Sequence, residues 1–119
     1  MPGPQGFPRR ERLTRKRDFK TVFEQGRKRV GRSFICYVVR REGQGRKLGL
    51  AVSRKVGSSV VRNRVKRYMR EVYRTHRAQL PEDLYVVIVA RPEAATLSYQ
   101  QCRDAIRQLL NTGDPPGDA

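Results

Sequence analysis

The side chains of this chain best suited to chemistry are the basic residues of SSVVRNRVKRYMREVYRTHR, residues 58–77. Arginine dominates the stretch, and its planar guanidinium makes paired hydrogen bonds to phosphate oxygens. Across the whole chain, 27 Lys and Arg stand against 11 Asp and Glu, for a net charge of +16. A charge of this size on a small protein indicates a polyanionic or strongly acidic partner.

The basic residues are concentrated in two parts of the chain. Residues 1–32 contain eleven basic and three acidic residues, and residues 53–77 contain nine basic residues and one acid, Glu71. Each segment therefore has a net charge of +8, and the remainder of the chain is balanced. Basic residues that served only solubility would be spread along the chain. Their concentration in two segments therefore predicts two cationic surfaces.

Residues 60–77 have the periodicity of an amphipathic helix. At about 100° per residue, one face collects Val61, Val65, Tyr68, Met69 and Val72. The far face collects Asn63, Lys66, Arg67, Arg70, Arg74 and Arg77, while Glu71 falls on a flank with Arg64. A solvated face is the ordinary interpretation of such a stripe. Because like charges at i, i+3 and i+4 destabilise a helix, we expect a polyanion to neutralise this one.

Four aromatic residues are candidates for stacking on unpaired bases: Phe19, Phe23, Phe34 and Tyr37. Phe19 and Phe23 share helical spacing with Val22, which by itself favours burial in the core. Phe34 and Tyr37 lie three positions apart in a strand and must point to opposite faces. At most one of these two can therefore share a given surface.

The chain is poor in groups that catalyse reactions. His76 is the only histidine, and we expect it to be an ordinary residue at the end of the basic helix. Paired carboxylates, a Ser-His-Asp set, a P-loop and metal-ligand spacings are all missing from the sequence, so no catalytic or metal-ligating residue is predicted. Cys36 and Cys102 stand in apolar surroundings and are predicted to be reduced core thiols.

The elements that must position these residues follow from periodicity and turn chemistry. We expect a helix from an N-cap at Thr14 to a stop at Gly26. A hairpin of strands 32–41 and 47–53 is expected to turn at 42–45. Then come the basic helix after Ser58, a strand at 84–90 buried on both faces, and a helix capped by Ser98.

This order, helix-strand-strand-helix-strand-helix, predicts an α-β sandwich with helices packed on one sheet. The length of 119 residues predicts a single domain, with an ordered core of about 9–110 between mobile tails at 1–8 and 111–119. No apolar run is long enough to cross a membrane, and the first residues lack the apolar centre of a signal peptide. We therefore expect a cytoplasmic protein without a membrane partner.

At GLAVSRKVGSSVVRNRVKRYMRE, residues 49–71, the chain resembles the bacterial ribonuclease P protein family. Arg62, Asn63 and Arg64 look like the RNR signature of that family. The resemblance extends through RLTRKRDFKTVFEQG (12–26), RSFICYVV (32–39) and LYVVIVARPEAATLS (84–98), which together span nearly all of 9–110. An ordered set of this length is far more specific than the tripeptide alone.

The resemblance implies both a fold and a function. The fold would be α+β, with one mixed sheet and a left-handed strand-helix-strand crossover, as in ribosomal protein S5 domain 2. The protein would bind a catalytic RNA, in a one-to-one complex, and assist the endonucleolytic removal of the 5′ leader from precursor tRNA. The hydrolase chemistry, and the magnesium ions that it needs, would belong mainly to the RNA subunit.

The resemblance also implies roles for single residues. The catalytic RNA would contact Arg62, Asn63, Arg64, Lys66, Arg67, Arg70 and Arg74. The leader would lie in a cleft between the first helix and the sheet, against Phe19, Phe23, Tyr37 and Lys55, which reverses the interpretation of the two phenylalanines as core. On a regular helix Arg62, Asn63 and Arg64 point about 100° apart. We therefore expect only Asn63 on the main stripe, with Arg62 and Arg64 gripping separate groups or packing sideways.

Two other hypotheses fit the charge. A structural RNA-binding protein of ribosomal type would share the sandwich but would not stimulate leader cleavage. A DNA-binding protein would place the basic helix in a major groove and would prefer duplex DNA to structured RNA.

Overall fold

The computed structural model describes residues 9–111, so the predicted tails, apart from Asn111, lie outside the described residues. One four-stranded sheet organises these residues, in the order β1-β2-β4-β3. Its strands are β1 (Arg27–Val30), β2 (Phe34–Arg40), β3 (Lys47–Val52) and β4 (Leu84–Ala90). The helices are α1 (Lys16–Gln25), α2 (Ser59–His76) and α3 (Tyr99–Leu110). Short 3-10 turns are η2 (Arg9–Glu11), η3 (Arg54–Val56), η4 (Arg77–Gln79) and η5 (Pro92–Thr96).

The apolar run of β4 makes it the centre of the sheet, as predicted. Its residues are buried on both faces except for Val89, which is half-buried. β4 pairs with β2 antiparallel and with β3 parallel, so the sheet is mixed. A strand that is apolar on both faces is most stable between two neighbours, where no face or edge meets water.

The predicted hairpin of 32–41 and 47–53 is therefore wrong. Both strands exist, but β4 lies between them, and the turn at 42–45 spans the gap with Gly43 and Gly45 at φ of 79°. The hairpin partner of β2 is β1, which pairs with it antiparallel from Arg27↔Val38 to Val30↔Ile35. Sequence reasoning missed β1 because its four residues, RKRV, carry three charges and no apolar alternation.

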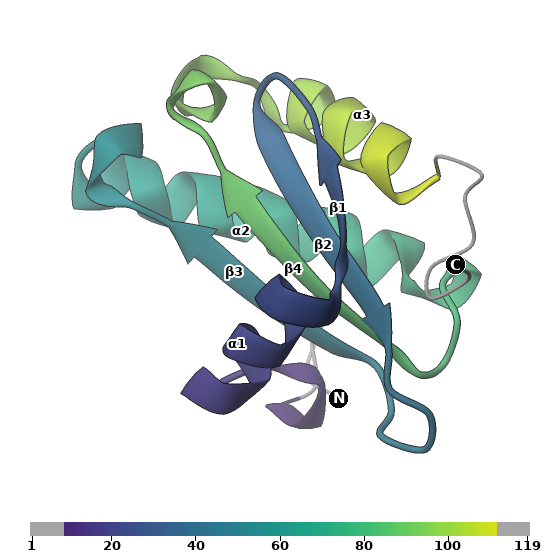
Figure 1. The fold of residues 1–119 in the computed structure, drawn as a ribbon. Coiled ribbons are helices and arrows are strands. Elements are labelled where there is room, and N and C mark those ends of the chain that lie inside the picture. The colour runs from purple at the N-terminus through teal and green to yellow at the C-terminus, as the bar shows by residue number, and fades with distance from the viewer. Residues whose placement is uncertain (1–8, 112–119) are drawn as a thin grey trace.

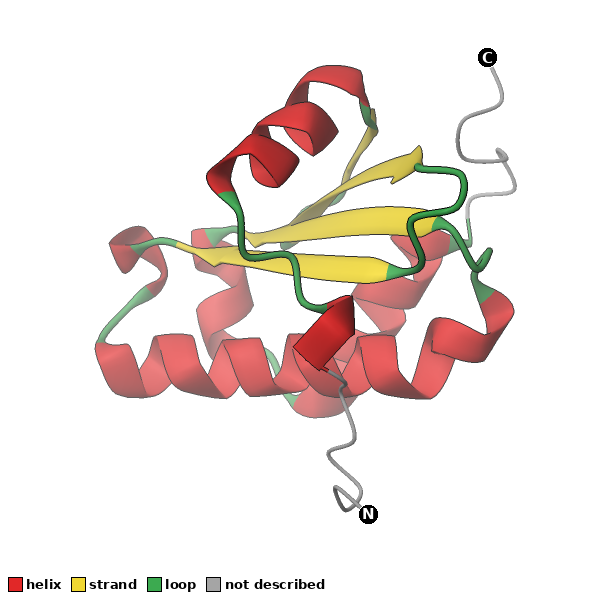
Figure 2. Ribbon diagram, turned by 90° about the horizontal axis from the view of Figure 1, so that it is seen from below, coloured by secondary structure: helices red, strands yellow, loops and turns green. Residues whose placement is uncertain are grey.

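The helices cover the two faces of the sheet unequally (Figures 1 and 2). α2 and α3 pack on one face around a large core that includes Phe34, Val65, Met69 and Ile88. α1 packs on the other face over a smaller core of Leu13, Val22, Tyr85 and Val87. The two cores use alternate residues of β2 and β4, as the twofold period of a strand requires.

The connection from β3 through α2 to β4 has the unusual left hand. When Figure 1 is turned so that the parallel strands β3 and β4 point upward, β4 lies to the right of β3 and α2 passes behind the sheet. Parallel strands are normally joined by a right-handed crossover. The α+β class, the mixed sheet and the left-handed crossover are thus confirmed.

Helix ends follow the expected caps with one exception. The Ser58 side chain accepts a hydrogen bond from the Val61 backbone N–H, and Ser98 forms a capping box with Gln101. Gly26 is the C-cap of α1 as predicted. Thr14 is not its N-cap, however, because α1 begins one residue later, after Arg15, without a side-chain cap.

Candidate nucleic-acid interface

α2 presents its predicted apolar face to the sheet and to α3. Val65, Met69 and Val72 are fully buried, and Val61 and Tyr68 pack at the margin of the same core. The opposite side of the helix is thereby turned toward solvent. Because the apolar face of α2 is buried, a partner can reach only the arginines on the side of the helix that faces solvent.

A cationic surface occupies the exposed side of the first three turns of α2. Within residues 9–111, no carboxylate lies within ion-pair distance of its residues, which we call the α2 basic face: Asn63, Lys66, Arg67 and Arg70. Burial, Arg12 and Arg67 all lower the pKa of Arg70. The like charges that the sequence predicted are therefore crowded together here.

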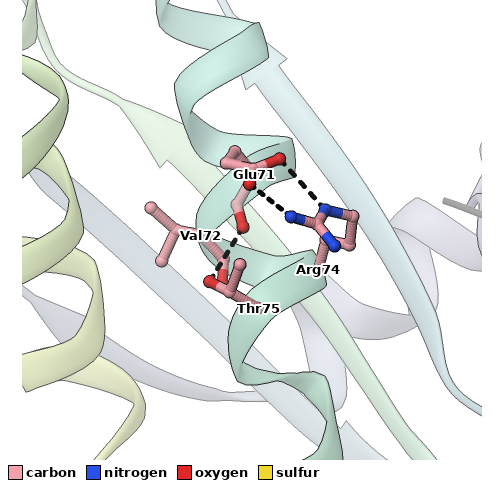
Figure 3. A network of polar contacts seen from close by, with 4 residues as sticks. All are labelled: Glu71, Val72, Arg74 and Thr75. Atoms are coloured by element: carbon pink, nitrogen blue, oxygen red, sulfur yellow. Dashed lines mark hydrogen bonds and ion pairs between the residues drawn. The ribbon is translucent and has the colours of Figure 1, made fainter. Parts of the chain in front are cut away.

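The stripe does not continue to the end of α2, contrary to the sequence prediction. The Arg74 guanidinium donates to both carboxylate oxygens of Glu71, at 3.0 and 2.5 Å (Figure 3). Arg77 makes an ion pair with Glu11. On a wheel Glu71 lies on the flank of the stripe, but a residue three positions away on a helix is still within reach of a long side chain. The expectation of an unpaired stripe is therefore wrong for Arg74 and Arg77.

Arg62, Asn63 and Arg64 point in separate directions, as predicted. The Arg62 Nε donates to the Gly57 carbonyl at 3.2 Å, and Arg64 donates to the Ala95 carbonyl. Both arginines therefore pack sideways, against the start of α2 and against η5. Asn63 is exposed on the α2 basic face.

A second candidate surface is aromatic and lies on the opposite face of the sheet. The rings of Phe19 and Phe23 stack with centroids 6.4 Å apart, and Phe23 meets the Tyr37 ring edge-on at 4.8 Å. Phe23 is 41% exposed, whereas Phe19 and Tyr37 are half-buried. We call these three residues the aromatic surface.

The core interpretation of the phenylalanines holds only in part. Phe19 packs against the sheet so closely that a Cβ on Gly49 would lie 2.6 Å from its ring. Phe23 remains open to solvent. Phe34 is fully buried on the α2 side, so it and Tyr37 occupy opposite faces as predicted, and Phe34 cannot stack on a base.

Around the aromatic surface, the sheet stays partly uncovered. Val30 is 58% exposed, and Ile35 and Val89 are half-buried on the same face as Tyr37. The Lys28 ammonium lies 5.9 Å from the centre of the Tyr37 ring. Sequence reasoning missed Lys28, because only the β1–β2 register places it opposite Tyr37. Lys55 is exposed on η3, past the carboxyl end of β3, and is not part of the ring cluster.

A cleft of about 410 Å³ lies at the β3 edge, next to the α2 basic face. It is lined by Arg12, Leu13, Thr14, Leu48, Leu50 and Arg70. Its two arginines come from the N-terminal segment and from α2, so only the tertiary structure brings them together.

His76 and the cysteines belong to the core. His76 is 2% exposed, and its Nε2 lies 3.2 Å from Oδ1 of Asn111. The sequence interpretation overlooked this burial, although the wheel places His76 on the apolar face. Cys36 and Cys102 are free and buried as predicted, and burial raises their thiol pKa values to about 12 and about 11.

Neither a metal site nor a membrane-spanning helix occurs among the described residues. Within residues 9–111, no three His, Cys, Asp or Glu side chains come together as a metal site. In the same range, no helix is both long and apolar enough to cross a bilayer. What the arrangement provides is one cationic and one aromatic surface, which suit a phosphate backbone and unpaired bases respectively.

Comparison with known proteins identifies the family. A family model described as Ribonuclease P matches residues 7–113 of the chain. The chain belongs to the ribonuclease P protein family. The ribonuclease P protein component of Dictyoglomus thermophilum is 44% identical over 106 residues, which cover 87% of this chain and 88% of that protein. The component of Desulfovibrio desulfuricans is 42% identical over 108 residues, covering 87% and 83%.

Solved ribonuclease P proteins share the fold. The RNase P protein of Staphylococcus aureus aligns with a TM-score of 0.81 at 24% identity, covering 88% of this chain and 96% of that chain. The RNase P protein of Thermotoga maritima aligns with a TM-score of 0.77 at 26% identity, covering 86% and 96%. The ribonuclease P resemblance of residues 49–71 thus extends to the whole described fold.

Proposed function

We propose that this chain is the protein subunit of ribonuclease P, which binds the catalytic RNA and the 5′ leader of precursor tRNA. In this role it assists the endonucleolytic removal of the leader. The observation that carries the proposal is the pair of unlike surfaces on opposite sides of one sheet. The α2 basic face suits a folded RNA backbone, and the aromatic surface suits a single strand.

The α2 basic face would hold the catalytic RNA. Lys66, Arg67 and Arg70 would contact phosphates, and Asn63 would add an amide that can donate and accept. Arg62 and Arg64 would hold the RNA from the two sides if they exchange their carbonyl partners for phosphate oxygens. Arg74 would have to exchange the Glu71 carboxylate in the same way, so we expect it to contribute less than Arg67.

The aromatic surface would hold the leader. Phe23 is the most open of its three rings and would stack on an unpaired base, while Phe19 and Tyr37 hold Phe23 in place. Lys55 would contact a leader phosphate farther along the strand. A mature tRNA lacks the leader, so this surface would discriminate precursor from product.

The hydrolysis itself would belong to the RNA subunit. We propose that magnesium ions are held mainly by that RNA and that no described side chain ligates them. The protein would act by charge neutralisation and by positioning of the substrate, in a one-to-one complex located in the cytoplasm.

Reconstitution tests this function. The protein is mixed with a bacterial ribonuclease P RNA and end-labelled precursor tRNA at low magnesium, and cleavage at the mature 5′ end is followed. We expect the protein to accelerate cleavage, because its cations replace part of the magnesium needed to neutralise the RNA. The Arg67→Glu variant serves as the charge control and should accelerate it less.

An unchanged cleavage rate would contradict the proposal. Tight RNA binding without acceleration would favour a structural RNA-binding protein of ribosomal type. Preference for duplex DNA in a competition assay would favour a DNA-binding protein.

A further inference from the structure

The N-terminal strap, residues 9–15, connects the two sides of the sheet. It starts at η2 beside α2, passes the β3 edge and continues into α1 on the opposite face (Figure 2). Leu13 donates its backbone N–H to the Leu48 carbonyl at 2.8 Å. The backbones of Arg12 and Leu48 form an isolated parallel β-bridge. The strap thereby extends the sheet at this edge.

Glu11 attaches the strap to the end of α2 and to η4, which follows it directly. Its side chain is buried, with 5% of the residue exposed, which is unusual for a carboxylate. The Tyr73 hydroxyl donates to Glu11 Oε1 at 3.1 Å, and the Arg77 guanidinium donates to Oε2. Burial and the nearby Glu11 carboxylate raise the pKa of Tyr73, so its hydroxyl stays protonated and donates.

This attachment fixes the start of α1. Four strap residues separate Glu11 from α1, and one of them, Leu13, is buried in the small core. The Phe19 ring packs next to Leu13 and over Gly49, where a Cβ would lie 2.6 Å from the ring and 3.0 Å from Leu13. Phe19 in turn stacks on Phe23. A continuous set of contacts therefore runs from Glu11 to the exposed ring of the aromatic surface.

The same attachment determines where Arg12 lies. Arg12 lines the cleft together with Arg70, on the border of the α2 basic face. If Glu11 were released, the strap could shift along the β3 edge, and both Arg12 and the aromatic surface would move relative to α2. The contacts of Glu11 are to a hydroxyl and a guanidinium, so they specify one position more strictly than apolar packing does.

We infer that Glu11 is a positioning residue that sets the aromatic surface at a fixed place relative to the α2 basic face. The inference rests on the proposed function, because the benefit of this arrangement is simultaneous contact with the RNA subunit and the leader. Loss of the Glu11 contacts should then weaken recognition of the leader in the assembled holoenzyme while the RNA subunit remains bound.

The test measures holoenzyme affinity for precursor tRNA and for mature tRNA. Glu11→Gln and Tyr73→Phe are compared with the wild-type protein and with Glu24→Gln, an exposed α1 carboxylate that pairs with Lys20. We expect Glu11→Gln to lower the ratio of the two affinities about fivefold or more, a normal size for coupling between sites. Tyr73→Phe should lower it less, and Glu24→Gln should leave both the ratio and the affinity for the RNA subunit unchanged.

Phe23→Ala separates failure of the inference from failure of the proposed function. If Phe23→Ala keeps the wild-type ratio, the aromatic surface does not bind the leader and both proposals are wrong. If Phe23→Ala lowers the ratio and Glu11→Gln does not, only the inference is overturned. A Glu11→Gln variant that loses affinity equally for precursor and mature tRNA would likewise overturn it.

A distance measurement checks the positioning without any RNA. Spin labels at Lys20→Cys on α1 and Thr75→Cys on α2 report the separation of the two helices, since Cys36 and Cys102 are fully buried. We expect one narrow distance distribution in the otherwise wild-type protein and a broader or shifted one with Glu11→Gln. Identical distributions would overturn the inference.

Discussion

At the scale of single residues, the partner of each arginine decides what it can do. Arg67 and Arg74 are the same residue type on one helix, seven positions apart. Arg67 has no carboxylate within ion-pair distance in the described part of the chain, whereas Arg74 is held by both oxygens of Glu71. Glu71 therefore limits the cationic surface of α2 at its C-terminal end.

This pairing predicts opposite effects for two substitutions. Glu71→Gln should release Arg74 to bind phosphate, so that affinity for the RNA subunit rises and its salt dependence steepens by up to about one unit of slope. Arg67→Ala should weaken binding and lower the slope by roughly one. The salt dependence of the dissociation constant measures both. An unaltered slope for Arg67→Ala would place Arg67 outside the interface.

His76 predicts how stability depends on pH. Burial and the nearby Arg107 lower its pKa, against an opposite effect of the Asn111 contact, so the folded protein holds His76 neutral. The unfolded chain takes up a proton at a higher pH than the folded protein, so stability is complete above about pH 6.5 and decreases as the pH falls below it. Thermal unfolding between about pH 7.5 and 5 should show a declining Tm. The decline should be shallower in His76→Gln, and equal slopes would contradict the assignment.

At the scale of elements, α1 illustrates how a helix is positioned by its contacts rather than by its own sequence. It is ten residues long, lacks a side-chain N-cap, and has one fully buried residue, Val22. Short helices of this kind are marginal alone and depend on tertiary packing. The strap and the contact between Phe19 and Gly49 provide that packing.

Gly49→Ala tests the packing of α1. Its new methyl group would displace the Phe19 ring, and overpacking of this kind typically costs about 1–3 kcal/mol of unfolding free energy. Denaturant unfolding measures the cost. In a Phe19→Ala background the same substitution should cost less, because the ring is gone, and strictly additive costs would show that Phe19 does not restrict Gly49.

At the scale of the whole molecule, the sheet separates the two candidate surfaces. α2, which carries the α2 basic face, packs on one side of the sheet, and α1, which carries Phe19 and Phe23 of the aromatic surface, packs on the other (Figure 2). Under the proposed function, one RNA would therefore occupy each surface without excluding the other. The strap at the β3 edge is the segment that connects them.

This separation predicts independent binding of two RNAs. A short single-stranded oligonucleotide with a leader sequence should bind the complex of protein and RNA subunit without displacing the subunit. Fluorescence anisotropy with differently labelled RNAs measures both events at once. Phe23→Ala should weaken binding of the oligonucleotide and leave binding of the RNA subunit unchanged. Displacement of the subunit in proportion to oligonucleotide binding would show that both RNAs use one surface.

Much of the fold followed from local patterns. The apolar run at 84–90, the wheel of α2 and the caps Ser58 and Ser98 are short-range features, and each gave an element close to the observed one. The hairpin was wrong because strand pairing can join residues far apart in sequence. The pairing of β2 with β4, for example, brings Tyr37 next to Val87. β1 was missed for a local reason, since RKRV has no apolar alternation.

For the site, composition and periodicity by themselves determined that α2 is a phosphate-binding candidate and that Arg62, Asn63 and Arg64 diverge. Helical geometry fixes those directions wherever the helix is placed. Only the tertiary structure decided that Arg77 is neutralised, because Glu11 lies 66 positions from Arg77 and meets it through the path of the strap. Only the tertiary structure left Phe23 open and buried Phe34, because that outcome depends on which face of the sheet each helix covers.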